Sequence, residues 1–179
     1  EFTTEVAKQL DANGISVNED MIRAIYTNIT CAESVSAEKK ARYQEIIDGL
    51  KLELSLDDEF AVIEKNFKEK AGSNYAASRG EFLNGIIMAE YLGYEFVDAA
   101  EVIFFHDNGE FNAEKTNKVL SARLAQCDKA VVPGFYGSMD DGRVKTFSRG
   151  GSDITGSIVA KAVKADVYEN WTDVSGFLI

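Results

Sequence analysis

The sequence contains few residues of the types that form disulfides, bind metals or interrupt regular secondary structure, namely cysteine, histidine and proline. It has two cysteines, Cys31 and Cys127, far apart and without a CxxC or Cys/His spacing, and a single histidine. These counts exclude a disulfide scaffold and a zinc centre, and they favour a cytoplasmic chain. One proline, Pro133, leaves no proline-rich linker. No apolar run approaches the roughly 18–20 residues that a membrane span needs, so no membrane partner is expected.

Basic residues are also in short supply. Lysine and arginine number 19 against 30 acidic residues, a net charge of -11. Such a surface repels phosphate backbones, so nucleic acid is not an expected partner. Hydrophobic residues make up 45% of the 179 residues and charged residues 27%, which indicates one soluble globular domain with a real core. The first residues have neither a basic cap nor an apolar stretch, so no signal peptide is predicted.

Apolar periodicity predicts helices in the first half of the chain and alternating strands and helices in the second. Helices are expected over 3–12, 20–30, 37–50, 57–70, 76–92, 112–126 and 153–164. Strands are expected over 95–97, 102–105, 130–132 and 167–171, with a hairpin over 135–147. The alternation in the second half predicts an α/β layered fold with a mainly parallel sheet.

The most informative stretch, Lys145 to Asp153, is a strand end, a glycine turn and a helix start. Two adjacent glycines let the backbone approach a ligand, and the N–H groups of the helix start favour an anion. Arg149 offers a planar fork for a carboxylate, Ser152 offers a hydroxyl, and Asp153 can cap the helix or face a cation. A plain turn with a good cap and a solvated arginine explains the same residue types, and on residue types alone that interpretation is favoured.

Two further stretches place polar residues where a ligand could bind. In Ser78-Arg79-Gly80-Glu81, the spacing of Ser78 and Glu81 is that of a helix capping box, and the alternative is that Glu81 holds an ammonium group. The second stretch, residues 171–177, reads Trp-Thr-Asp-Val-Ser-Gly-Phe. Its Thr-Asp pair follows an expected strand end, where open α/β sheets place ligands, although an ordinary turn fits equally well. Trp171 itself is expected in the core.

In this order and at this spacing, the three stretches resemble the aspartate kinases of the amino acid kinase family. The resemblance runs from about residue 41 to 179, and residues 1–35 stay unplaced or divergent. It implies a three-layer αβα sandwich with a mainly parallel sheet, of the amino acid kinase or carbamate kinase type. It further implies an incomplete catalytic domain without the ACT regulatory domains that usually follow. The implied activity is ATP-dependent phosphorylation of L-aspartate to 4-phospho-L-aspartate, the first step towards lysine, threonine and methionine.

The resemblance assigns the substrate-binding residues one by one. Glu81 matches the glutamate that holds the aspartate amino group. Arg149 matches the arginine that clamps the α-carboxylate, with Ser152 assisting. Gly150 and Gly151 complete the implied substrate-binding set with their backbone amides.

The remaining assignments concern phosphoryl transfer. Asp153 matches the catalytic aspartate that organises the reacting groups, and Thr172 and Asp173 match positions that contact the nucleotide. The implied cofactors are ATP and Mg²⁺, and the charge that develops on the phosphate is neutralised by the cation, a lysine and backbone amides. The implied partners are L-aspartate and ATP, and further copies of the chain in the full-length enzyme.

The sequence departs from the family pattern in several places. Neither the opening Lys-Phe-Gly-Gly strand, whose lysine bridges to the transferring phosphate, nor the later Ala-Asp-Pro-Arg occurs, and Glu19 stands where the family has a substrate-contacting threonine. The 179 residues alone are therefore expected to show little turnover and to associate through exposed sheet edges. A non-catalytic aspartate-binding remnant and an amino acid kinase with another substrate stay open as alternatives.

Overall fold

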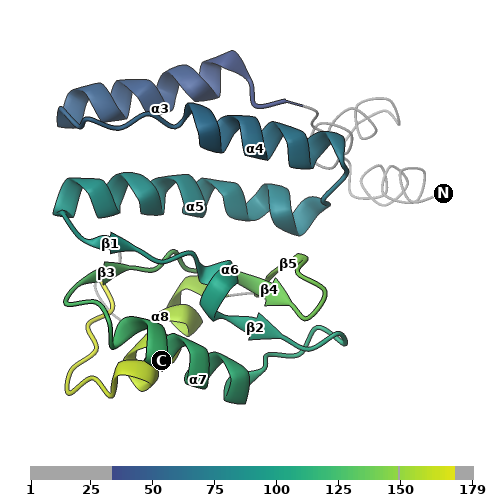
Figure 1. Ribbon diagram of the computed structural model, residues 1–179, viewed down its shortest axis with the longest axis vertical. Coiled ribbons are helices and arrows are strands. Elements are labelled where there is room, and N and C mark those ends of the chain that lie inside the picture. Colours follow the sequence, from purple (N-terminus) through teal and green to yellow (C-terminus); the bar gives the residue numbers. More distant parts are fainter. Residues whose placement is uncertain (1–33, 149, 172–179) are drawn as a thin grey trace, which may run out of the picture.

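The computed structural model describes residues 34–148 and 150–171, so the helices expected over 3–12 and 20–30 lie outside the described residues. Figure 1 shows the described elements in layers: two helices at one end, one long helix, the short strands, and two helices at the other end. In chain order the elements are α3 (Ala37–Leu50), α4 (Asp57–Lys68), α5 (Ser73–Leu92), β1 (Glu95–Phe96), α6 (Ala99–Val102), β2 (Phe104–Phe105), α7 (Ala113–Leu124), β3 (Ala130–Val131), β4 (Tyr136–Met139), β5 (Val144–Thr146) and α8 (Gly151–Val163).

The strands form two small sheets in the middle layer. Strand β1 pairs in parallel with β3, and β2 pairs in parallel with β4, whose other edge is antiparallel to β5. Two of these three pairings are parallel, as expected. Helix α5 lies on one side of the strands and the α7–α8 pair on the other, which makes the αβα arrangement (Figure 1). The α3–α4 pair adds a further helical layer outside α5.

Local signals define several elements at the positions expected from the sequence. Helix α3 has the predicted bounds, and its N-cap Ser36 accepts a hydrogen bond from the Lys39 N–H at 3.3 Å. Asn112 caps α7 by accepting from the Lys115 N–H at 3.0 Å. The hairpin of β4 and β5 turns at Gly142, whose φ of +83° is in the region that glycine adopts freely.

One strand prediction is wrong in its start and another is wrong entirely. The stretch expected as a strand over 102–105 begins as the last residue of α6, a helical turn whose N-cap Asp98 accepts from the Ala100 N–H at 2.9 Å, so β2 is only Phe104–Phe105. Residues 167–171 form no strand and pair with none of the strands that the structure describes. In both cases the residues have a high β-propensity, but their structural context determined a different conformation.

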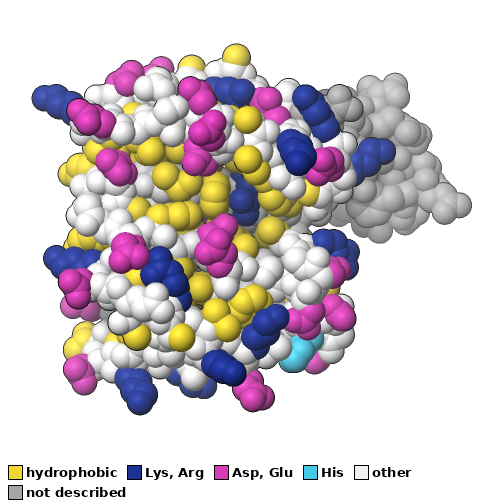
Figure 2. Space-filling model, viewed as in Figure 1, with side chains coloured by type: hydrophobic (Ala, Val, Ile, Leu, Met, Phe, Trp, Pro, Cys, Tyr) yellow, Lys and Arg dark blue, Asp and Glu magenta, His cyan; other side chains and the backbone are white. Residues whose placement is uncertain are grey.

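Two apolar clusters hold the layers together, one on each side of α5. The first joins α5 to α3 and α4 through the buried residues Ile47, Leu56, Phe60, Ile63, Leu83 and Ile87. The second joins the strands to α6, α7 and α8 and includes Val97, Ile103, Phe105, Leu120 and Tyr136. Figure 2 shows apolar surface left open at the level of α5. No helix of the described residues is long and apolar enough to cross a bilayer.

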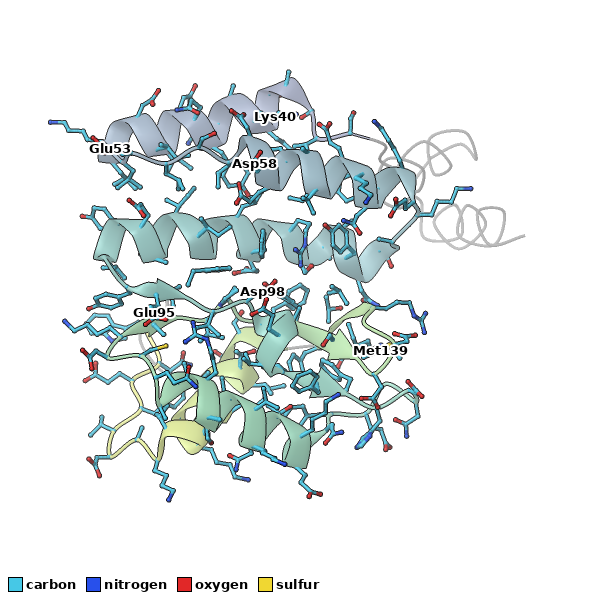
Figure 3. The ribbon with its side chains drawn as sticks, viewed as in Figure 1. Lys40, Glu53, Asp58, Glu95, Asp98 and Met139 are labelled. Atoms are coloured by element: carbon cyan, nitrogen blue, oxygen red, sulfur yellow. The ribbon has the colours of Figure 1, made fainter. Side chains whose placement is uncertain are left out.

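A polar contact ties the α6 cap to the strands. The fully buried Tyr136 of β4 donates from its Oη to Asp98 Oδ1 at 2.7 Å. Figure 3 labels Asp98, which lies between α5 and the strands at the start of α6. Burial, and then the negative charge of Asp98, raise the pKa of the Tyr136 phenol far above its usual value of 10. The phenol is therefore a hydrogen-bond donor throughout the physiological pH range.

Candidate functional site

A cavity of about 490 Å³ opens between α5, the carboxyl end of β3 and helix α8. Among its lining residues are Glu81 from α5, Gly134 from the segment after β3, and Ser152 and Thr155 from α8. Two residues that the sequence singled out in separate motifs, Glu81 and Ser152, therefore face the same space. The site lies past the carboxyl end of a parallel strand, which is where α/β sheets place ligands.

The glycine turn forms the start of α8. This helix begins at Gly151, two residues before the expected start, and its N-cap Gly150 has φ +59° and no side-chain cap bond. The plain-turn interpretation required a good cap, and the described residues supply none. The first-turn N–H groups therefore stay available for an anion. A Cβ on Gly151 would lie 3.0 Å from both Phe135 Cα and Phe147 Cβ, so a larger residue would fit only if the loop or the helix start shifted.

A loop outside the three motifs forms the wall opposite this helix start. It consists of Pro133, Gly134 and Phe135, which follow β3. A Cβ on Gly134 would lie 3.1 Å from Ser152 Cα and 3.2 Å from Ser152 Oγ, so the loop backbone touches the predicted binding residue. Phe135 has a φ of +80°, which is unusual for a bulky residue. The sequence signal for this wall was a Pro-Gly pair after the strand expected over 130–132.

Glu81 has no part in capping its helix. Helix α5 starts at Ser73 with Gly72 as N-cap, so Ser78 lies inside the helix, where its Oγ donates to the Tyr75 carbonyl at 2.7 Å. The capping-box interpretation is therefore wrong, because the helix begins earlier than its spacing suggested. Glu81 is exposed and lines the cavity, so its carboxylate is available for a ligand.

The neighbouring Arg79 fixes α5 against the strands. Its side chain is only 8% exposed, and its guanidinium carbon lies 4.4, 4.5 and 5.3 Å from the ring centres of Tyr75, Phe82 and Tyr136. Its Nε and Nη2 also donate to Ser78 Oγ at 3.0 and 2.8 Å. Aromatic faces and a hydroxyl thus stabilise this cation inside the protein. Arg79 anchors the turn of helix that presents Glu81.

Asp153 is exposed at the start of α8, and its Oδ1 accepts from Asn170 Nδ2 at 3.1 Å. Among the described residues it is not part of the cavity lining. Its predicted catalytic role therefore stays a prediction. Arg149, Thr172 and Asp173 lie outside the described residues, although Arg149 directly precedes the Gly150 cap.

The segment after α8 lies beside this helix. The Tyr168 ring packs against Gly156, where any Cβ would overlap its Oη, and Tyr168 also lines the cavity. Trp171 is 89% exposed, and its Nε1 donates to Glu169 Oε2 at 3.1 Å. The prediction of a core tryptophan is therefore wrong, because without a paired strand this segment buries little of its apolar surface.

A second cavity, of about 820 Å³, lies between α5 and the α3–α4 pair. Glu81 lines this cavity as well, together with Tyr43 and Arg42 of α3. Burial, and then the charge of Glu81, raise the pKa of Tyr43. Arg42 already pairs with Glu45 at 2.9 Å. Of the residues in the three motifs, Arg79, Gly80 and Glu81 line this cavity, and none of the described residues at the start of α8 does.

Comparisons with known proteins point in one direction. A family model described as the Amino acid kinase family matches residues 3–179. Aspartokinase 3 of Bacillus subtilis (strain 168) is 37% identical over 170 residues, covering 82% of this chain and 37% of the relative. The lysine-sensitive aspartokinase 3 of Escherichia coli (strain K12) is 46% identical over 112 residues, covering 55% of this chain and 24% of the relative.

The solved structures include a relative that aligns along nearly the whole chain. The crystal structure of Clostridium acetobutylicum aspartate kinase is similar with a TM-score of 0.74 and 45% sequence identity. The alignment covers 98% of this chain and 37% of that chain. The chain thus spans well under half the length of the kinases it resembles.

Proposed function

This chain belongs to the amino acid kinase family, and we propose that it forms part of the catalytic domain of an aspartate kinase. The reaction is the transfer of the γ-phosphoryl group of ATP to the β-carboxylate of L-aspartate, which gives 4-phospho-L-aspartate and ADP. The observation that supports this proposal best is the shared cavity of Glu81 and Ser152, in a chain that resembles aspartokinases from several bacteria.

The cavity offers complementary groups for an α-amino acid. The exposed Glu81 carboxylate supplies the negative charge for the ammonium group. Across the cavity, the backbone amides from Gly150 to Ser152 and the Ser152 hydroxyl receive the α-carboxylate at a helix start without a side-chain cap. Arg149, next in sequence to this start, completes the carboxylate clamp in the proposal. Held at both ends, the substrate directs its β-carboxylate towards the nucleotide.

The roles proposed in phosphoryl transfer fall to Asp153, in the first turn of α8, and to residues that follow this helix. Asp153 orients the reacting groups, and Thr172 and Asp173 contact the nucleotide. The described residues contain no group of three histidine, cysteine or carboxylate side chains that could hold a metal. Proteins usually hold Mg²⁺ through one or two carboxylates and the phosphates of its substrate. When bound, Mg²⁺ neutralises phosphate charge beside a protein of net charge -11.

The proposed setting is the cytoplasm, where a kinase of free amino acids meets ATP. The full-length enzyme is proposed to form a homo-oligomer. Apolar side chains left at the surface support this proposal, namely Ile46 and Leu50 of α3 and Met88, Tyr91 and Leu92 of α5.

The proposal is tested with the polypeptide encoded by the complete open reading frame. Acyl phosphate formed from ATP and L-aspartate is trapped as a hydroxamate. Glu81→Gln removes the charge that holds the ammonium group, and loss of such a charged hydrogen bond should raise the KM for aspartate about 10- to 100-fold. Glu90→Gln, on the same helix but outside both cavity linings, is the matched control and should stay within about twofold of wild type. Equal KM values for the two variants, or a wild type that phosphorylates L-glutamate in preference to aspartate, would refute the proposal.

A further inference from the structure

The hydroxyl of Thr155 makes one hydrogen bond within α8 and a second one to a loop outside the helix. Its side chain is 3% exposed, and its Oγ1 donates to the Gly151 carbonyl one turn earlier at 2.7 Å. That bond is common for threonine in helices. The same oxygen, however, also accepts from the Phe135 N–H at 3.0 Å, across from α8 in the loop after β3. One hydroxyl thus joins the helix start to the opposite wall of the cavity.

The loop that Thr155 holds is in an unfavourable conformation. The left-handed φ of +80° at Phe135 persists in a folded protein only when the surroundings fix it. Two hydrogen bonds do so here: the Phe135 N–H donates to Thr155, and its carbonyl accepts from the Phe147 N–H at 2.9 Å. The bond from Phe147 ties the loop to β5, whereas the bond to Thr155 ties it to the helix that carries Ser152.

The loop and the helix start are packed without spare room. The Cβ positions of Gly134 and Gly151 would each lie within about 3 Å of the opposite backbone, against Ser152 Cα at 3.1 Å and Phe135 Cα at 3.0 Å. Packing of this kind prevents the two walls from moving closer. Among the described residues, the bond from the Phe135 N–H to Thr155 Oγ1 is the one hydrogen bond between this loop and α8, and it opposes separation of the two walls.

We propose that Thr155 is a positioning residue for the amino acid substrate. Its hydroxyl sets the distance between the loop of Gly134 and Phe135 and the first turn of α8, and thereby the place at which Ser152 meets the α-carboxylate. This inference rests on the proposed aspartate kinase function. It assigns Thr155 an effect on aspartate binding and none on ATP binding.

The test compares Thr155→Val with Thr155→Ser in the full-length protein by hydroxamate kinetics. Valine keeps the shape but loses both hydrogen bonds, whereas serine keeps the hydroxyl. We expect Thr155→Val to raise the KM for aspartate about tenfold or more, with the KM for ATP within about twofold of wild type, because misplaced binding groups lose affinity steeply. Thr155→Ser should stay within about threefold of wild type for both substrates. A residue that only supports folding would lower kcat through the active fraction and leave both KM values unchanged.

The outcomes separate this inference from the proposed function. A wild type without hydroxamate formation overturns the proposed function and the inference with it. An active wild type in which Thr155→Val keeps its aspartate KM, or in which Thr155→Ser is impaired as much as Thr155→Val, overturns the role of Thr155 alone. If Thr155→Val does not fold, Thr155→Ala is compared with Thr155→Ser by the same criteria, since that pair also differs by the hydroxyl.

Discussion

Replacing Gly151 by alanine adds a single methyl group at the tightest point of the candidate site. The new Cβ would lie 3.0 Å from Phe135 Cα and 3.0 Å from Phe147 Cβ. Carbon atoms prefer separations of about 3.5–4.0 Å, so the loop or the helix start must move by a few tenths of an ångström. One of the two contacts is a backbone atom, which cannot rotate away.

This movement should lower both the free energy of unfolding and the binding of aspartate. Overpacking of this kind typically costs about 1–3 kcal/mol, of which the better helix propensity of alanine recovers at most about 1 kcal/mol. Catalysis should register the shift as well: a displacement of about 1 Å at a binding group can cost about 10²-fold in rate, so a smaller shift should lower kcat/KM for aspartate by up to about tenfold.

Urea unfolding and hydroxamate kinetics on the full-length protein measure the two effects. Gly49→Ala is the matched control: it makes the same chemical change inside α3, where the added Cβ meets nothing within 4 Å. It should leave activity unchanged and should not destabilise the protein. If Gly151→Ala behaved like Gly49→Ala in both assays, the close approach of the loop to α8 would not limit the site, and the reasoning would be refuted.

Two predictions concern the titration of buried and paired groups. Because the folded-state pKa of Tyr136 is raised, chiefly by burial, the stability it contributes is complete below about pH 10 and falls as the pH rises further. Tyr136→Phe removes its bond to Asp98, should cost about 1 kcal/mol near neutral pH, and should flatten the loss of stability between about pH 10 and 12 in urea titrations; an unchanged slope would contradict this cause. The pKa of Glu95 is lowered from its usual 4.5, chiefly by the hydrogen bond from Arg123, so its contribution is present above that value and disappears as the pH falls. Glu95→Gln should therefore unfold with a weaker dependence on acid pH than wild type, and parallel curves for the two proteins would argue against the pairing.

The parts of the fold that local chemistry determines were predictable from the sequence. Ser36 and Asn112 cap their helices with their own side chains, and Gly142 turns its hairpin through its own backbone freedom. In each case the contact that fixes the conformation joins residues a few positions apart. The sequence pattern and its physical cause therefore lie in the same short segment. The bounds of α3 were correct for the same reason.

The wrong predictions depended on residues outside the motif that suggested them. Ser78 and Glu81 have capping-box spacing, but the start of the helix was decided upstream at Gly72. Trp171 belongs to a β-prone segment, and yet whether that segment becomes a strand depends on a neighbouring strand. A single-sequence pattern does not contain that information.

The candidate site likewise has one part that was predictable from the sequence and one that was not. The glycine turn and Ser152 were visible as a motif, because their chemistry lies in consecutive residues. The wall made by Gly134 and Phe135 was not, because its contacts with Ser152 and Thr155 form only after the chain has folded. The left-handed conformation of Phe135 had no sequence signal, since phenylalanine does not favour it.

The central claim is that Glu81 and the start of α8 hold the two ends of one amino acid. A crystal structure of the full-length protein with L-aspartate tests this most directly. We predict the ammonium group within hydrogen-bonding distance of the Glu81 carboxylate, and the α-carboxylate at the amides of residues 150–152 and the Ser152 hydroxyl. Aspartate bound outside this cavity, or bound in it without contact to Glu81, would contradict the account.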